Sequence, residues 1–301
     1  MSEAVTSRHH VPSGGVLRRL FVCLAVSIFV LVGWGFVVSP NAFAETIRDD
    51  PTGGDCTSVG SWNAASKTCT LTTDLSNPLD IASNNVSLDG AGHTITGPGY
   101  GNGVTNDRHT GVIIKNLNIR QFYYGIYIQG AAPDGQTNAT LSNNTSDNSN
   151  YGIYIDGSYG NNLSGNTMSG NTYNFAVNGY GANDDPSVNH YYENTIDTSN
   201  LVDGKPIYYL RNASGQTFDS STNAGVFYCI SCSNIEVRDL TLSKNDVGVY
   251  FYNTQNSQVE NINSSNSSIG ISLAYSNNNT ITGGTTGQNQ NVGISVGNSI
   301  G

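Results

Sequence analysis

The chain of 301 residues carries 12 basic and 22 acidic side chains, which gives it a formal net charge of −10. Residues 1–44 hold three of the arginines and one glutamate, so the remainder has a net charge of −12. A surface this acidic repels phosphate backbones, so we do not expect nucleic acid to be a partner. The 17 tyrosines and the many Ile and Val residues also argue against intrinsic disorder, which goes with high charge and few such side chains.

The first 44 residues have the three parts of a secretory signal peptide. Arg18 and Arg19 form the positive region, Leu20–Val38 is an apolar run, and Ala42-Phe43-Ala44 gives a small-x-small cleavage pattern. The apolar run is long enough to span a bilayer, so an uncleaved hydrophobic helix is the alternative and the one membrane contact that we expect. Either way, the sequence predicts an extracellular, periplasmic or cell-surface location.

Four cysteines remain beyond the signal segment: Cys56, Cys69, Cys229 and Cys232. In an oxidising compartment their spacing predicts two local disulfides, Cys56–Cys69 and Cys229–Cys232. A redox motif with the spacing of the second pair would be expected at the start of a helix, and zinc would need two further ligands. We therefore interpret both pairs as structural.

A short element, Gly followed by apolar-x-apolar, recurs along the chain. It begins at Gly103, Gly125, Gly152, Gly225, Gly248, Gly270 and Gly293, with Asn174 in place of glycine once. The steps are 22, 27, 22, 51, 23, 22 and 23 residues, which is a coil of 22–23 residues with one short and one long insertion. Such a period predicts an all-β, right-handed parallel β-helix solenoid.

Within each coil, alternation predicts that two apolar columns point into the solenoid and one column points out. The first inward column is Ile126, Ile153, Phe175, Val226, Val249, Ile271 and Ile294. The second is Ile128, Ile155, Val177, Tyr228, Phe251, Leu273 and Val296. A second strand, half a coil earlier, carries Ile114, Leu141, Leu163, Val237 and Val259.

Two residues after each of these apolar positions stand Asn116, Asn143, Gly165, Asp239 and Asn261. Asn tolerates the left-handed backbone that a corner requires, and its amide can bond to the same group in the next coil. The asparagine content of the chain is therefore expected to be structural.

These patterns divide the chain into a signal segment (1–44), a disulfide-containing N-terminal segment (45–74) and a β-helix (75–301). The helix is interrupted by an irregular insertion at about 178–223. The sequence stops in the middle of the repeat, without the polar cap that normally protects an open β-edge, so we expect it to continue in a longer protein.

The residues also resemble a known family. Gly54-Asp55-Cys56 to Cys69-Thr70-Leu71-Thr72, then Leu88-Asp89-Gly90-Ala91-Gly92-His93, resemble the start of NosD-like periplasmic β-helix proteins, whose repeats are of the carbohydrate-binding and sugar-hydrolase type. The segment Asn200–Tyr209 is similar to an insertion between coils in that family. The resemblance covers nearly all of residues 50–301 and implies a β-helix.

The family name also suggests copper, through nitrous oxide reductase maturation. Copper sites have clustered His, Cys or Met ligands, whereas His93, His109, His190 and Met168 are far apart in the sequence. We therefore predict no metal site and no cofactor, with calcium as the one ion that paired acidic residues would suit.

The predicted outward column is the best candidate for binding. Its aromatic members Tyr127, Tyr154, Phe227 and Tyr250 could stack on the apolar C–H faces of sugar rings, with Tyr123 and Tyr124 close by. The alternative is that these residues only favour strands and shield the sheet. The sequence thus favours an exported, non-catalytic protein that binds a polysaccharide or cell-surface glycan.

Catalysis has weaker candidates, all in the insertion: Asp184, Asp185, Lys205 and Arg211, with His190 and Asp203 nearby. Adjacent acids can hold calcium, and a cation beside them could take the proton next to a uronate carboxylate. A polysaccharide lyase, hydrolase or epimerase acting on uronate-type glycans is therefore the first alternative. A structural surface stalk and a NosD-type copper-maturation accessory protein are the others.

Overall fold

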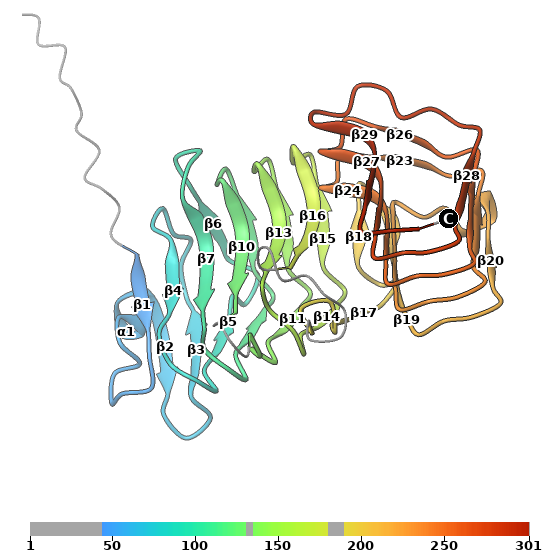
Figure 1. Ribbon diagram of the computed structural model, residues 1–301. Helices are drawn as coiled ribbons and strands as arrows, with labels where there is room; N and C mark the ends of the chain where they lie inside the picture. Colours follow the sequence, from blue (N-terminus) through green and yellow to red (C-terminus); the bar gives the residue numbers. More distant parts are fainter. Residues whose placement is uncertain (1–43, 131–134, 180–189, 301) are drawn as a thin grey trace, which may run out of the picture. The chain divides into compact units, whose positions relative to one another are not determined.

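The computed structural model describes residues 44–130, 135–179 and 190–300 (Figure 1). Every described residue lies in one compact unit, Pro40–Gly301. The predicted signal peptide falls almost entirely outside the described residues and stays a prediction. Among the described residues, no helix is long and apolar enough to cross a membrane.

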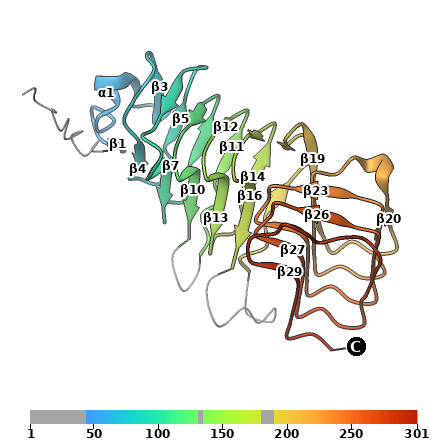
Figure 2. The same ribbon diagram turned by 90° about the horizontal axis from the view of Figure 1, so that it is seen from above.

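The structure is a parallel β-solenoid of about 10 turns, as the repeat predicted. Helical structure in the described part is limited to α1 (Cys56–Val59) and the 3-10 turn η2 (Ser220–Thr222). Figure 2 shows β7, β10, β13 and β16 side by side in the first sheet. The strands of this sheet are β1 (Glu45–Ile47), β4 (Leu79–Ile81), β7 (Asn102–Asp107), β10 (Tyr124–Gln129), β13 (Tyr151–Asp156) and β16 (Tyr173–Asn178).

Two further sheets close the coils. The second sheet holds β2 (Gly60–Asn63), β3 (Thr68–Leu71), β5 (Ser87–Asp89), β8 (Ile113–Lys115), β11 (Thr140–Ser142), β14 (Asn162–Ser164) and β17 (Thr195–Ile196). The third begins with β6 (Thr94–Thr96), β9 (Asn118–Arg120), β12 (Thr145–Asp147), β15 (Thr167–Ser169) and β18 (Leu201–Val202). Because β1 pairs with β4 and β3 with β5, strands of the segment 45–74 already belong to these sheets.

The third sheet continues through an antiparallel pair, β18 with β19 (Lys205–Arg211). Parallel pairing then resumes along β21 (Val226–Ile230), β24 (Val247–Tyr252), β27 (Ile269–Ala274) and β29 (Val292–Gly297). The other strands of this region are β20 (Thr217–Phe218), β22 (Glu236–Arg238), β25 (Gln258–Glu260) and β28 (Thr280–Thr282) in one sheet, with β23 (Thr241–Ser243) and β26 (Asn263–Ser265) in another. We call residues 45–202 the first stack and 205–300 the second stack.

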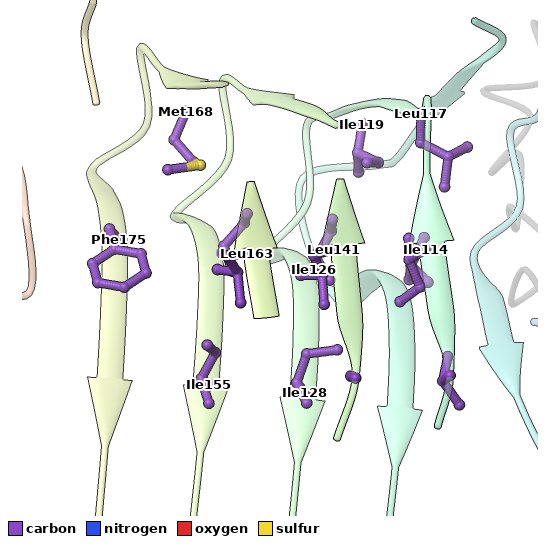
Figure 3. Packing of buried hydrophobic residues seen from close by; sticks show 14 of the residues in the cluster. Ile114, Leu117, Ile119, Ile126, Ile128, Leu141, Ile155, Leu163, Met168 and Phe175 are labelled. Atoms are coloured by element: carbon purple, nitrogen blue, oxygen red, sulfur yellow. The ribbon is translucent and has the colours of Figure 1, made fainter. Parts of the chain in front are cut away.

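The predicted inward columns are buried in the first stack (Figure 3). Ile126 pairs with Ile153, and Ile153 with Phe175, while Ile114, Leu141 and Leu163 from the second sheet face them. All six side chains are fully buried. The coils are stacked about 4.8 Å apart. Burial of each such side chain contributes roughly 1.5–3 kcal/mol to the free energy of unfolding.

The glycine of the repeat also faces inward. A Cβ on Gly125 would lie 1.9 Å from Ser146 Oγ and 2.6 Å from the carbonyl oxygen of Gly152, so no larger residue fits. Because Gly125 and Ile126 both face the core, the alternation breaks there. Tyr124 therefore joins Tyr127 on the outer face.

The prediction of one continuous column is wrong beyond Phe175. Val249 pairs with Phe227 rather than with Val226, so β21 is shifted by one residue from the register that Gly225 suggested. Phe227, Cys229, Val249, Phe251 and Ile271 form the core of the second stack, which is separate from the core of the first. The physical reason is the reversal at β18–β19, which starts a new stack.

The predicted left-handed corners are confirmed, because Asn116, Asn143, Gly165, Asp239 and Asn261 all have φ between 49° and 64°. The buried amide ladder, however, uses the next residue in the chain. Asn144 Nδ2 donates to Asn166 Oδ1 (2.9 Å), and Asn166 Nδ2 donates to Asn200 Oδ1 (2.8 Å). These amides also bond to backbone groups that the turns would otherwise leave unpaired.

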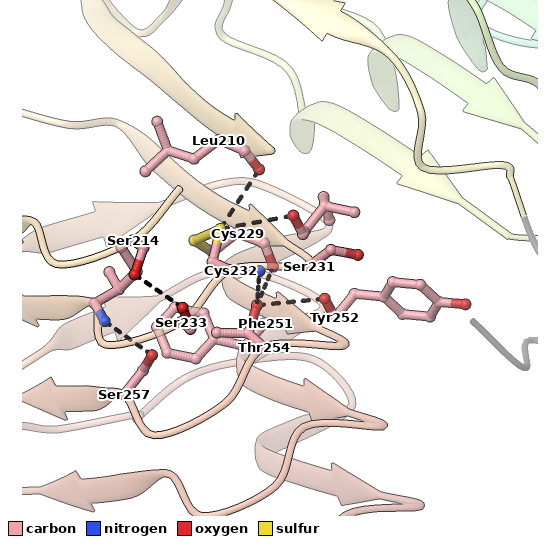
Figure 4. Close-up of a disulfide and its surroundings, with 12 residues drawn as sticks. Leu210, Ser214, Cys229, Ser231, Cys232, Ser233, Phe251, Tyr252, Thr254 and Ser257 are labelled. Carbon is pink, nitrogen blue, oxygen red and sulfur yellow. Dashed lines mark hydrogen bonds between the residues drawn. A yellow bond between two sulfur atoms is a disulfide. The ribbon is translucent and has the colours of Figure 1, made fainter. Parts of the chain in front are cut away.

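Both predicted disulfides are confirmed: Cys56 is bonded to Cys69, and Cys229 to Cys232. The second pair is buried in the second stack, where Cys232 N donates to Thr254 Oγ1 at 3.3 Å (Figure 4). Its burial in a strand and turn agrees with a structural role.

Candidate functional site

Six tyrosines gather on the outer face of the first sheet and its edge, and we call them the tyrosine face. They are Tyr123, Tyr124, Tyr127, Tyr151, Tyr154 and Tyr173. The register places Tyr124 beside Tyr151 and Tyr151 beside Tyr173, with Tyr127 beside Tyr154. Parallel pairing thus brings tyrosines from three coils onto one surface.

The rings pack mainly against one another. The ring centroids of Tyr124 and Tyr127 are 5.0 Å apart and nearly parallel, and those of Tyr127 and Tyr154 are 5.9 Å apart. Four of the six are half-buried, and Tyr173 is buried. Tyr123 is the exception, because 44% of it is exposed. A ligand on this face would therefore meet ring edges, hydroxyl groups and the free surface of Tyr123.

Acidic and amide groups border the rings. Tyr127 donates its hydroxyl hydrogen to Asp156 Oδ2 (2.9 Å), and Asn178 Nδ2 donates to the hydroxyl oxygen of Tyr154 (3.2 Å). Burial, together with the negative charge of Asp156, raises the pKa of Tyr127 and of Tyr154 above the ordinary tyrosine value. The rings therefore stay neutral at physiological pH, and the hydroxyl groups remain available for hydrogen bonds.

The structure separates the predicted binding residues. Tyr127 and Tyr154 lie together on the tyrosine face, whereas Phe227 is fully buried in the second core and Tyr250 is only 8% exposed. The one-residue shift of β21 turns Phe227 inward, and Tyr192 covers Tyr250, with a ring-centroid separation of 5.4 Å. The prediction that these four residues form one outward surface is therefore wrong for Phe227 and Tyr250.

Sequence reasoning missed two members of the face, Tyr151 and Tyr173. Each stands directly before the repeat position, as Tyr124 does before Gly125. A tyrosine recurring at that position in three coils was the available signal, and strict alternation from the glycine concealed it.

An open groove of about 740 Å³ runs along the corner beside Tyr123. Its lining residues come from four consecutive coils and none is charged: Gly97, Pro98, Gly99, Gln121, Phe122, Tyr123, Asn148, Ser149, Asn150 and Thr172. A smaller crevice of about 350 Å³ shares Thr172 and includes Tyr173, Lys244 and Gln290. From the sequence, the polar residues at these corners were expected to have a structural role only.

The proposed catalytic residues are not brought together in the described part of the chain. Asp184 and Asp185 lie outside the described residues. Arg211 is within 3.5 Å of Glu193, which also contacts His190, whereas Lys205 Nζ donates to the carbonyl oxygen of Thr241 (3.1 Å) in a different small pocket. Lys205 and Arg211 thus have separate partners, and the arrangement supports no shared acid–base site.

Metal-binding side chains are also dispersed. Among the described residues, no group of three or more His, Cys, Asp or Glu side chains could hold a metal ion. The four described cysteines are in disulfides, Met168 is fully buried, and His93 pairs with Asp74 at 3.2 Å. This donor set does not fit a copper centre, which needs soft or imidazole ligands converging on one point.

A comparison with known families gives a match on the part of the chain that contains the second stack. Residues 187–301 match the family described as periplasmic copper-binding protein (NosD). For those residues the resemblance to NosD-like β-helix proteins is confirmed. The NosD family is periplasmic, which confirms the predicted location outside the cytoplasm. No curated protein matches the chain.

Proposed function

We propose that this protein is an exported, non-catalytic β-helix that binds polysaccharide through the tyrosine face. The observation that supports this proposal is the contact of six tyrosines from three coils on one outer surface, with Tyr123 exposed at its edge. Flat aromatic rings match the apolar faces of sugars, and hydroxyl, amide and carboxylate groups at the border can bond to sugar hydroxyl groups.

The scaffold supports the same proposal. Four of the tyrosines (Tyr124, Tyr127, Tyr151 and Tyr154) stand on β10 and β13, which are paired on both sides, and neighbouring rings hold one another in place. Little side-chain freedom remains to be lost when a ligand binds, so weak individual contacts can add up to useful affinity. The competing interpretation is that the rings only shield the sheet, and binding measurements distinguish the two.

The test is affinity electrophoresis of the full chain through gels that contain neutral or acidic polysaccharides. At least one polysaccharide should retard the wild-type protein. The double variant Tyr123→Ala/Tyr127→Ala should lose the retardation, while Tyr250→Phe, which changes a buried ring, should behave as wild type. If no polysaccharide retards the wild type, or if the double variant is retarded as strongly, the proposal fails.

A copper-related accessory role is the second candidate, and only the NosD match favours it. Because the described His, Cys and Met side chains do not converge, we place it behind glycan binding. Equilibrium dialysis of the full chain against copper, compared with a His93→Ala/His190→Ala variant, separates the two. Tight binding that depends on these histidines would favour the copper role.

A further inference from the structure

We propose that the corner groove beside Tyr123 is a binding site for an uncharged oligosaccharide that crosses successive coils. This inference rests on the proposed function and assigns it a ligand class and a place. The groove is formed where the chain turns from the third sheet into the first, at Gln121–Tyr123 and again at Asn148–Asn150. Its volume of about 740 Å³ lies within the range of small-molecule sites.

The floor of the groove is held by internal hydrogen bonds. Phe122 N donates to Ser149 Oγ (3.2 Å), and Ser149 N donates to Asn171 Oδ1 (2.8 Å). The amide of Asn148 is bonded to the carboxylate of Asp147. Because these groups already have partners, the floor keeps its shape without a ligand.

The rim differs from the floor. Within the described residues, the side-chain amides of Gln121 and Asn150 and the hydroxyl group of Thr172 have no hydrogen-bond partner. They come from three consecutive coils and border the same groove. An amide offers both donors and an acceptor, which is what a ring of sugar hydroxyl groups requires.

Aromatic surface stands at the mouth of the groove. Tyr123 lines it, and Tyr123 N donates to the carbonyl oxygen of Gly101 (2.9 Å), next to Tyr100. Tyr100 is 61% exposed. Gly99 (φ 93°) and Gly101 (φ 71°) permit the left-handed turns that carry this segment past the groove. Tyr100 and Tyr123 are thus free to contact the C–H faces of a sugar.

Charge selects against acidic glycans. None of the lining residues is charged. The neighbouring Arg120 and Asp147 are register partners of opposite sign, and Lys244 lines the adjoining crevice rather than the groove. A uronate, sulfate or phosphate group would find no unpaired cation among the lining residues and would face the net negative charge of the protein. A neutral sugar needs no cationic partner and is not repelled by the negative charge of the protein. We therefore assign an uncharged ligand.

The length of the site follows from the coils. Four consecutive coils contribute to the groove, and coils rise about 4.8 Å each, so the lining spans about 14 Å along the stack. A ligand that uses the whole groove is therefore an oligosaccharide or a polysaccharide segment lying across the strands.

The test is calorimetric titration of the full chain with neutral oligosaccharides (glucan, mannan and chitin fragments) and with oligouronates of equal length. The groove variant combines Gln121→Gly, which keeps the left-handed backbone at φ 62°, with Asn150→Ala. The matched control is Asn256→Gly, an exposed left-handed position (φ 51°) in the second stack. We expect a neutral fragment to bind, the groove variant to raise its Kd at least about ten-fold, and the control to leave it unchanged.

Two outcomes overturn this inference while leaving the proposed function intact. One is tighter binding of oligouronates than of any neutral fragment. The other is wild-type affinity in the groove variant combined with loss of binding in Tyr123→Ala/Tyr127→Ala. Absence of binding by every glycan would instead overturn the proposed function itself. Circular dichroism of each variant establishes that it is folded.

Discussion

The hydroxyl group of Tyr151, on the tyrosine face of the first stack, acts on the carboxyl group of Asp246 in the second stack and lowers its pKa against the larger effect of burial. Ser268 lowers this pKa as well, and no cation is among the groups that act on the carboxyl group. Its negative charge helps to raise the pKa of four tyrosines, Tyr151, Tyr154, Tyr173 and Tyr228. Asp246 therefore connects the border of the candidate site to the junction of the two stacks.

The first prediction concerns pH. Burial raises the pKa of Asp246 from 3.8 to about 6, so between these values the folded protein binds more protons than the unfolded chain. The contribution of Asp246 to stability is therefore present below about pH 4 and is lost as the pH rises through 6, by roughly 2–3 kcal/mol.

Urea unfolding of wild type and Asp246→Asn at several pH values tests this prediction. The asparagine keeps the size of the side chain but cannot ionise, so the variant should be the more stable protein at pH 7.5 and should lose this advantage by pH 4. Taking the difference between the two proteins removes the effect of the other carboxylates. A difference that does not change with pH would contradict the assignment.

The second prediction concerns the shifted register of β21. Phe227→Ala should reduce the free energy of unfolding by about 3–5 kcal/mol, because it opens a cavity in the core of the second stack. Tyr123→Ala, at an exposed ring, should change it by less than about 0.5 kcal/mol. Equal effects of the two changes, measured by chemical unfolding, would be incompatible with the observed register.

The third prediction concerns the asparagine ladder. Asn166 Oδ1 accepts from Asn144 N and Nδ2, while Asn166 Nδ2 donates to Leu141 O and Asn200 Oδ1. Asn166→Ala leaves several buried groups unpaired and should lower the free energy of unfolding by about 3 kcal/mol. Asn143→Gly, at the neighbouring exposed left-handed corner (φ 55°), is the control and should be nearly neutral. Urea unfolding of both variants measures the two changes. A loss of stability in Asn143→Gly as large as that in Asn166→Ala would contradict the prediction.

The fourth prediction compares the disulfides. Cys56–Cys69 spans 13 residues and Cys229–Cys232 only 3, so loop-closure entropy gives about 3 kcal/mol for the first and about 1.5 kcal/mol for the second. Paired Cys→Ser variants should therefore show a larger loss of stability for the first pair.

Both pairs are nearly fully buried, so mild reductant should leave them intact in the folded protein. Labelling of free thiols after treatment with the reductant tests this expectation.

Much of the fold could be predicted from the sequence, because coil length and corner conformation are local properties. The step of 22–23 residues identified the strands around Ile126, Ile153 and Ile271, and Asn116 and Asn143 marked left-handed corners. Local spacing also paired the cysteines correctly. Each of these features depends on residues within one coil and the next.

Tertiary structure alone decided the register of β21, the division into two cores and the burial of Tyr250. Periodicity does not specify where a solenoid reverses, and β18–β19 reverse through a short antiparallel pair that carries no repeat signal. Nor does it show that Tyr192, from the irregular insertion, covers Tyr250. Whether an outward tyrosine meets solvent or another part of the chain depends on contacts between distant segments, and these contacts confined the candidate site to the first stack.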